Sequence, residues 1–225
     1  MIVTPSTSAG FKDAHRGETI YVLGSGKSLD YIDPAFFADK IVVGTNAIGH
    51  VLGLYDYYTA TAYHACAVNY LDARPDLPVV VPETDWGAVL LTPSRDFVPG
   101  EPVYRFPTGP QLYDCFDAEE HWPTDPDALV MGPTSLHMAM HFAAYLGAST
   151  IVLGGADCGT LDGHINLAAY PLADSTDNPM SVWQRHLAAV AEQLRRRGTA
   201  VYSLNPFVNF ALEGHDYRSA TANIN

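Results

Sequence analysis

A glycine-rich turn, Gly24-Ser25-Gly26-Lys27-Ser28, is the first stretch of the chain whose residue types could bind a ligand. It follows the β-branched and apolar residues 19–23, which are typical of a buried parallel strand. Main-chain N–H groups in such a turn, at the start of a helix, can hold a phosphate or a ribose. The alternative is a plain tight turn, in which the glycines serve only the backbone geometry.

Neither of the common phosphate-binding motifs fits this turn. A Walker loop needs a glycine five residues before the Gly-Lys pair, where this chain has Tyr21. A dinucleotide fingerprint needs a third glycine at the position of Leu29. The turn therefore predicts a phosphate or ribose contact without identifying the nucleotide.

Asn46 follows the next apolar run, residues 41–44, which predicts a second strand. At the carboxyl end of a neighbouring parallel strand, its side chain would face the same crevice as Gly26, where open α/β sheets bind ligands. An amide can both donate to and accept from a base or a sugar. An asparagine that only shapes a turn is the alternative.

Two carboxylates and an imidazole lie close together after a third apolar run, residues 151–153. Asp157, Asp162 and His164 could bind a metal or supply a general base, since histidine titrates nearest to neutral pH. The alternative is a solvated turn with Asp162-Gly163 at its tip.

Three other histidines lie in helical patterns. His137 and His141 have the i, i+4 spacing that suits a metal, but no third ligand is evident, so we predict no metal site there. His186 lies beside the apolar face of a later helix and is interpreted as a packing residue.

The order of strands and helices predicts a single α/β domain over residues 1–225, with a mainly parallel sheet and helices on both faces. Helical spacing marks residues 134–147, with Thr134 or Ser135 as the cap and Gly147 at the end, and residues 183–194. Further strands are expected at residues 57–60, 79–81 and 201–204.

Two stretches lack a sustained period. Residues 82–127, rich in Pro, Asp, Thr and aromatic residues, are expected to form an insertion or lid over the site. Residues 1–17 are interpreted as a loose N-terminal arm.

Composition excludes several classes of partner. The net charge of −13, from 25 acidic and 12 basic residues, repels nucleic acid phosphates. No run approaches the ~20 apolar residues of a membrane helix and no signal peptide is evident, so we expect a cytoplasmic protein. The three cysteines form no CxxC pair, which argues against a disulfide framework and a zinc ribbon. A homo-oligomer is suggested only by its general frequency.

The chain resembles the bacterial sialyltransferases of glycosyltransferase family 42 and the related motility-accessory-factor and pterin-diphosphokinase-like Rossmann proteins. Three early motifs carry the resemblance, namely residues 22–29, 32–33 and 45–46. Three later blocks complete it, namely residues 134–147, 151–157 and 201–206. The resemblance implies a Rossmann-like fold and leaves the middle of the chain unmatched.

In the sialyltransferases the donor, cytidine monophosphate-sialic acid, is held at the positions of Ser25, Gly26, Asn46, Ser135, Gly155 and Asp157. With their neighbours, the predicted nucleotide-binding residues are Gly24, Ser25, Gly26, Lys27, Ser28, Asn46, Thr134, Ser135, Gly155 and Asp157. The chain departs from the family at Lys27, which replaces a proline, and at Ser25, which replaces an asparagine. The family's catalytic histidine has no clear match, and the nearest position is Ser181.

We therefore expect a transferase that uses a nucleotide-sugar donor and requires no cofactor. His164 or Asp157 would deprotonate an acceptor hydroxyl while the turn and Asn46 hold the nucleotide. One alternative is a diphosphokinase that uses ATP and Mg²⁺, with Asp157 and Asp162 as metal ligands. Another is a nucleotide-binding module without catalysis.

Overall fold

A parallel sheet of seven strands organises the chain. The computed structural model describes residues 11–46, 48, 56–59, 79–82, 103–106, 108–111, 122–131, 134–170 and 180–205. The strands lie in the order β5-β4-β3-β2-β1-β8-β9, and every neighbouring pair is parallel. In chain order they are β1 (Thr19–Leu23), β2 (Ile41–Thr45), β3 (Tyr57–Thr59), β4 (Val79–Pro82), β5 (Val103–Phe106), β8 (Thr150–Gly154) and β9 (Ala200–Ser203).

The strand order reverses direction at β1. The chain builds outward from β1 through β2, β3, β4 and β5, and then returns to add β8 and β9 on the other side of β1. A short separate sheet pairs β6 (Thr108–Gln111) with β7 (Leu129–Met131). The predicted α/β class with a parallel sheet is confirmed.

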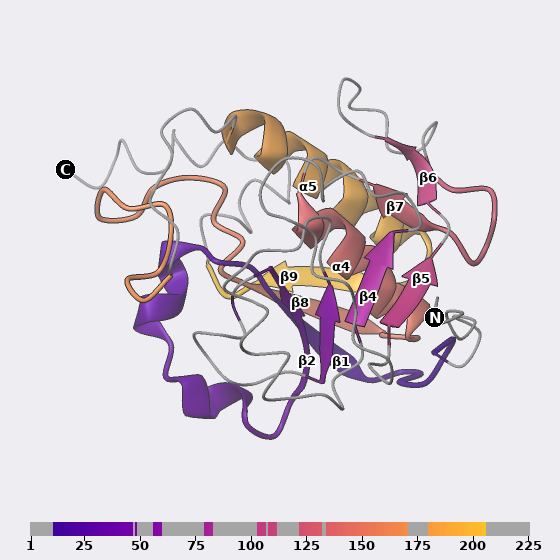
Figure 1. Ribbon diagram of the computed structural model, residues 1–225, viewed down its shortest axis with the longest axis horizontal. Helices are drawn as coiled ribbons and strands as arrows, with labels where there is room; N and C mark the ends of the chain where they lie inside the picture. The colour runs from indigo at the N-terminus through magenta and orange to yellow at the C-terminus, as the bar shows by residue number, and fades with distance from the viewer. Residues whose placement is uncertain are drawn as a thin grey trace, which may run out of the picture.

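Helices cover the two faces of the sheet unequally. The helix α4 (Ser135–Tyr145) packs on β1, β2 and β7, and α5 (Met180–Arg196) packs on α4 and β9. The shorter 3-10 helices η2 (Lys27–Tyr31) and η3 (Pro34–Phe37) follow β1. In Figure 1, α4 and α5 lie together, while the purple segment that carries η2 and η3 lies away from them.

Side chains of β1 alternate between these two layers, as the period of a strand requires. Ile20 and Val22 are fully buried in the core cluster that they share with α4 and α5. Tyr21 instead contacts Phe36 and Phe37 edge to face, with ring centroids 5.7 and 5.9 Å away. A strand that packs on both faces explains why residues 20–23 are apolar without a gap.

The expectations for the two helices hold closely. The helix α5 begins three residues before the predicted segment and ends two residues after it, and its predicted apolar positions Leu187, Val190, Ala191 and Leu194 are buried. Gly147, predicted to end α4, has the positive φ of 92° that a helix C-terminal glycine adopts. None of the helices within the described ranges has the length and apolar character needed to cross a membrane.

Residues 11–17 differ from the predicted loose arm. The amides of Asp13, His15 and Gly17 donate hydrogen bonds to the carbonyls of Tyr145, Leu146 and Gly147, at 3.1, 2.7 and 2.8 Å. These bonds satisfy carbonyls that the end of α4 leaves without helical partners. The arm is fixed because it supplies these donors, which its own sequence does not reveal. Residues 1–10 lie outside the described part of the chain.

The stretch 82–127 is not irregular throughout. Within it, Val103–Phe106 pairs with β4 as the edge strand β5, and Thr108–Gln111 pairs with β7. The run Val-Tyr-Arg-Phe has the residue types of a strand, but prolines on both sides hid it among turn signals. The remainder up to residue 121 lies outside the described residues, so the proposed lid stays a prediction.

His137 makes the stability of this core dependent on pH. Its side chain on α4 is fully buried, and burial lowers its pKa from 6.5 to about 4, with His186 of α5 acting in the same direction. The unfolded chain therefore takes up the proton first as the pH falls below 6.5. The shifted pKa of His137 therefore lowers the free energy of unfolding by roughly 3 kcal/mol as the pH falls from 6.5 toward 4.

Urea unfolding at several pH values would measure this effect. We expect His137→Leu to reduce the slope of unfolding free energy against pH between 4 and 6.5. Phe142→Leu, on the same helix and equally buried, should lower stability without changing the slope. Equal slopes in wild type and His137→Leu would contradict the prediction.

Candidate functional site

The carboxyl ends of β1, β2 and β8 meet at one edge of the sheet. Leu23 of β1 lies in register with Gly44 of β2 and with Gly154 of β8. The residues that follow these three positions therefore leave the sheet side by side. Thr45 joins two of the ends, because its hydroxyl donates to the Leu23 carbonyl at 3.0 Å. The three strand ends therefore meet at one edge of the sheet, while the expectation that they open onto a single crevice stays a prediction.

Glycines allow the turn after β1 to approach the end of β8. A Cβ on Gly24 would lie 2.6 Å from the Gly155 carbonyl oxygen, and one on Gly26 would lie 2.7 Å from the Asp157 carboxyl group. Gly155 itself has a φ of +60°. The Gly24 and Gly26 amides donate to the carbonyls of Gly154 and Gly155, each at 2.8 Å. These glycines are thus required by close backbone packing.

Asp157 is a buried anchor between three segments. One carboxylate oxygen accepts from the Ser28 amide at 2.7 Å, and the other accepts from the Ser28 hydroxyl at 2.6 Å. The Asn205 side chain, just beyond β9, donates to the second oxygen at 3.0 Å. Because both oxygens are engaged, this geometry suits Asp157 to holding the turn in place better than to accepting a substrate proton.

Asn205 was not among the predicted site residues. It follows the last predicted strand directly, which is the same signal that selected Asn46 after β2. Its side chain is buried and binds Asp157. The pattern of a polar residue directly after a predicted strand would therefore have found it.

A strap, residues 165–168, lies across the glycine turn. The Lys27 amide donates to the Ile165 carbonyl at 3.1 Å, and the Leu167 amide donates to the Ser25 carbonyl at 2.9 Å. The Ser25 hydroxyl donates to the Asn166 side-chain oxygen at 2.8 Å. The strap and the turn thus form a short antiparallel pair, with a bridge between Gly26 and Asn166.

The sequence suggested that the main-chain amides of the turn are available to a ligand. In the structure, most of them already donate hydrogen bonds within the chain. From residue 24 to residue 29, five of the six amides donate within the chain, namely those of Gly24, Gly26, Lys27, Ser28 and Leu29. The Lys27 ammonium forms an ion pair with Asp30 at 2.6 Å. The short 3-10 helix η2 also offers little dipole to an anion. The turn therefore borders the site, but few of its amides are available to bind a phosphate.

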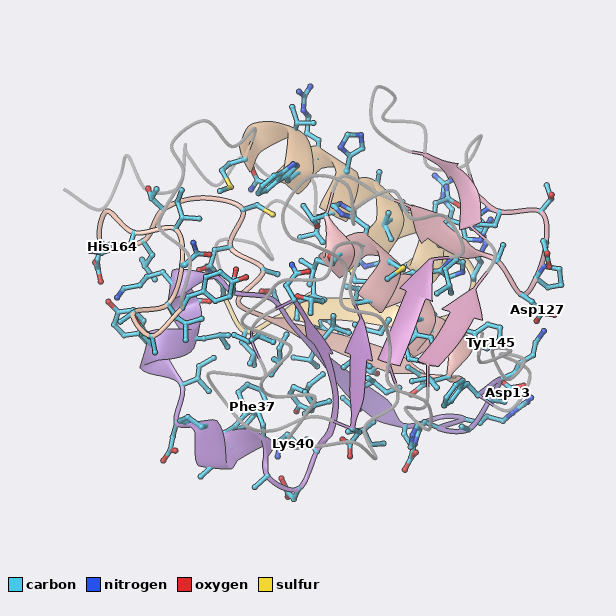
Figure 2. All side chains as sticks on the ribbon, in the orientation of Figure 1. Asp13, Phe37, Lys40, Asp127, Tyr145 and His164 are labelled. Atoms are coloured by element: carbon cyan, nitrogen blue, oxygen red, sulfur yellow. The ribbon has the colours of Figure 1, made fainter. Side chains whose placement is uncertain are left out.

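His164 lies at the exposed base of a two-residue hairpin. Asp162 and Gly163 have φ values of 53° and 77°, the positive pair that a type I′ hairpin turn requires. Leu161 and His164 exchange backbone hydrogen bonds of 2.9 and 3.0 Å, and the Tyr31 hydroxyl donates to the Asp162 carboxylate. The solvated turn considered above is the arrangement found here, and Figure 2 shows His164 at the rim of the molecule, far from Tyr145.

A second polar group lies on the other side of β1, where α4 begins. Asn46 has a φ of +53°, and the buried Ser135 hydroxyl donates to its side-chain oxygen at 2.8 Å. Thr134 occupies the N-cap position without a side-chain bond to the helix amides. The N-terminus of this helix carries partial positive charge. Asn46, Thr134 and Ser135 thus gather as predicted, at an edge that favours an anion.

The described residues offer neither a metal-binding cluster nor a reactive thiol at this site. Among the residues that the structure describes, no group of three or more His, Cys, Asp or Glu side chains could hold a metal ion. Burial raises the pKa of the Cys158 thiol to about 12, and the neighbouring Asp157 acts in the same direction, so the reactive thiolate is not formed near neutral pH.

Comparison with known proteins leaves the chain in the broad class that its fold defines, an α/β protein with a parallel sheet. No protein-family model matches the sequence, and no curated protein or solved structure is significantly similar to it. The site must therefore be interpreted from its own residues.

Proposed function

We propose that the protein binds a nucleotide, as part of a nucleotide-sugar donor, and transfers the sugar to an acceptor. The observation that carries the proposal is the convergence of β1, β2 and β8 where the strand order reverses, with Asn46 and Ser135 at the edge. Open parallel sheets bind ligands in the crevice at such a reversal. The strand order agrees with the Rossmann-like fold that the resemblance implies.

The contacts suggest a division of roles. Asn46, Thr134 and Ser135 offer hydroxyl and amide groups to the nucleotide, and the start of α4 favours its phosphate. Asp157 keeps the glycine turn against β8. Since Asp157 is engaged by Ser28 and Asn205, His164 is the remaining candidate for the general base of the transfer, and its place in an exposed hairpin means that the acceptor would have to reach it from solution.

A nucleotide-binding module without catalysis is the second candidate. It is favoured by one observation, the engagement of both Asp157 oxygens, which removes one of the two expected bases. The same observation weakens the Mg²⁺-dependent diphosphokinase alternative, because a metal would have to displace Ser28 or Asn205 from this carboxylate.

Calorimetric titration would test nucleotide binding. Cytidine 5′-monophosphate, the other nucleoside 5′-monophosphates and inorganic pyrophosphate serve as probes, without added metal. We expect binding by at least one nucleotide, and a loss of about five- to tenfold in affinity in Ser135→Ala, because a hydroxyl hydrogen bond contributes ~1 kcal/mol. Binding that requires Mg²⁺ would instead favour the diphosphokinase.

Ser149→Ala is the matched control. The Ser149 hydroxyl also donates a hydrogen bond, at 2.8 Å to the Gly17 carbonyl, but Ser149 precedes β8 and lies at the opposite edge of the sheet. Its substitution should leave the nucleotide affinity unchanged. The absence of binding by every probe would end the proposal.

A further inference from the structure

Within the described part of the chain, β9 is the last strand on its side of the sheet. The amides of Ala200 and Leu204 donate to the carbonyls of Ser149 and Leu153, at 2.9 and 2.8 Å, and so point toward β8. Because the direction alternates along a strand, the N–H and C=O groups of Val201 point to the outer side. An outer side of this kind is a template for pairing with a strand of another molecule.

The residue types of β9 favour such pairing. Residues 200–204, Ala-Val-Tyr-Ser-Leu, include β-branched and aromatic residues but no charge and no proline. Val201 lies in the core cluster beneath α4 and α5, so the next side chain, Tyr202, lies on the opposite face, where it is 54% exposed. An uncharged edge strand with an exposed aromatic residue needs protection against association.

Arg195 of α5 covers the outer side of β9. One terminal nitrogen of its guanidinium group donates to the Val201 carbonyl at 3.0 Å. The other terminal nitrogen lies 3.9 Å from the Glu192 carboxylate, one turn earlier on α5, and the Arg195 side chain is only 30% exposed. A strand that paired with β9 at Val201 would have to displace this cation, which is a common means of protecting an edge.

We propose that Arg195 prevents β9 from pairing with the β9 strand of a second copy of this chain. A second copy is the expected occupant because two identical edge strands can pair antiparallel about a two-fold axis. With Arg195 in place, the Val201 carbonyl already has a donor, and such a pair would bring two guanidinium groups close together. This role of Arg195 is independent of the proposed nucleotide site.

Sedimentation velocity over a range of protein concentrations tests this role. Arg195→Met keeps much of the aliphatic stem but removes the donor and the charge. We expect its mass to rise with concentration toward twice the wild-type mass, while its circular dichroism stays native. Arg195→Ala should behave in the same way, and Arg195→Lys, which keeps a cation with N–H donors, should stay at the wild-type mass. The wild-type mass in both Arg195→Met and Arg195→Ala would overturn the inference.

Arg196→Met is the matched control. Arg196 lies in the same last turn of α5, but its guanidinium group binds the Glu192 carboxylate, at 3.1 Å. The variant loses the same charge from the same helix end, and its mass should equal that of the wild type. Association as strong as that of Arg195→Met would overturn the inference, because the lost charge and not the exposed edge would then be the cause.

Two further measurements locate the contact. In the associated Arg195→Met protein, the Val201 amide should exchange with deuterium about tenfold more slowly than in the wild type, because it gains a partner in the second copy. Adding Tyr202→Lys to Arg195→Met should restore the wild-type mass, because a lysine on an edge strand disfavours pairing. Association without protection of the Val201 amide, or association that survives Tyr202→Lys, would place the contact elsewhere and overturn the inference.

Discussion

Gly155→Ala is expected to lower the free energy of unfolding by roughly 3–5 kcal/mol, because two separate costs add at this position. Its φ of +60° lies in the left-handed region, which costs a residue with a Cβ about 1–2 kcal/mol. In addition, the new Cβ would lie 2.5 Å from the Gly24 carbonyl oxygen and 2.9 Å from the Gly26 nitrogen. Both are backbone atoms and cannot move aside without separating the turn from β8.

Gly163→Ala separates the two costs. This glycine also has a positive φ, of 77°, but a Cβ there would have no heavy atom within 4 Å. Its substitution should cost only about 1–2 kcal/mol in the same urea unfolding measurement. Equal stability of the two variants would contradict the prediction, because it would mean that the close approach of the turn to β8 adds no cost to the substitution of Gly155.

Asp157→Ala is expected to lower the free energy of unfolding by about 3–5 kcal/mol, because it leaves three buried donors without an acceptor. These donors are the Ser28 amide, the Ser28 hydroxyl and the Asn205 side chain. Asp157→Asn should cost less, about 2 kcal/mol, since one oxygen remains while the new NH₂ group faces a donor. Urea unfolding monitored by circular dichroism would give both values.

Asp162→Asn provides the comparison for this carboxylate. Asp162 is exposed at the hairpin tip, and asparagine accepts its φ of 53° well, so we expect a change within about 0.5 kcal/mol. A small effect at both positions would contradict the role of Asp157 as an anchor. A large effect on stability at Asp157 would also mean that a loss of activity in its variants does not identify a catalytic base.

These two predictions concern the same contact, the attachment of the glycine turn to β8. Sequence reasoning found the participants, since Gly24, Gly26, Gly155 and Asp157 all follow apolar runs. It assigned them to a ligand because glycines and a carboxylate after a strand have that use in many α/β proteins. The structure shows that they first bind one another.

The sequence by itself determined the α/β class, the central strands and both long helices. Their residue patterns are local, with a continuous apolar run in β1 and the helical spacing of Leu187, Val190, Ala191 and Leu194 in α5. The sequence also predicted that Asn46 lies at the edge formed by the carboxyl ends of the strands, because the carboxyl ends of neighbouring parallel strands meet at one side of a sheet.

Only the tertiary structure decided which polar groups are already engaged. The partners lie far apart in the chain, as Ser28 and Asp157 do at a separation of 129 residues, and Ser25 and Asn166 at 141. No local pattern encodes such pairs, because each donor has many acceptors of suitable chemistry elsewhere in the sequence. For the same reason, the burial of His137 beside α5 appeared only once the two helices were packed together.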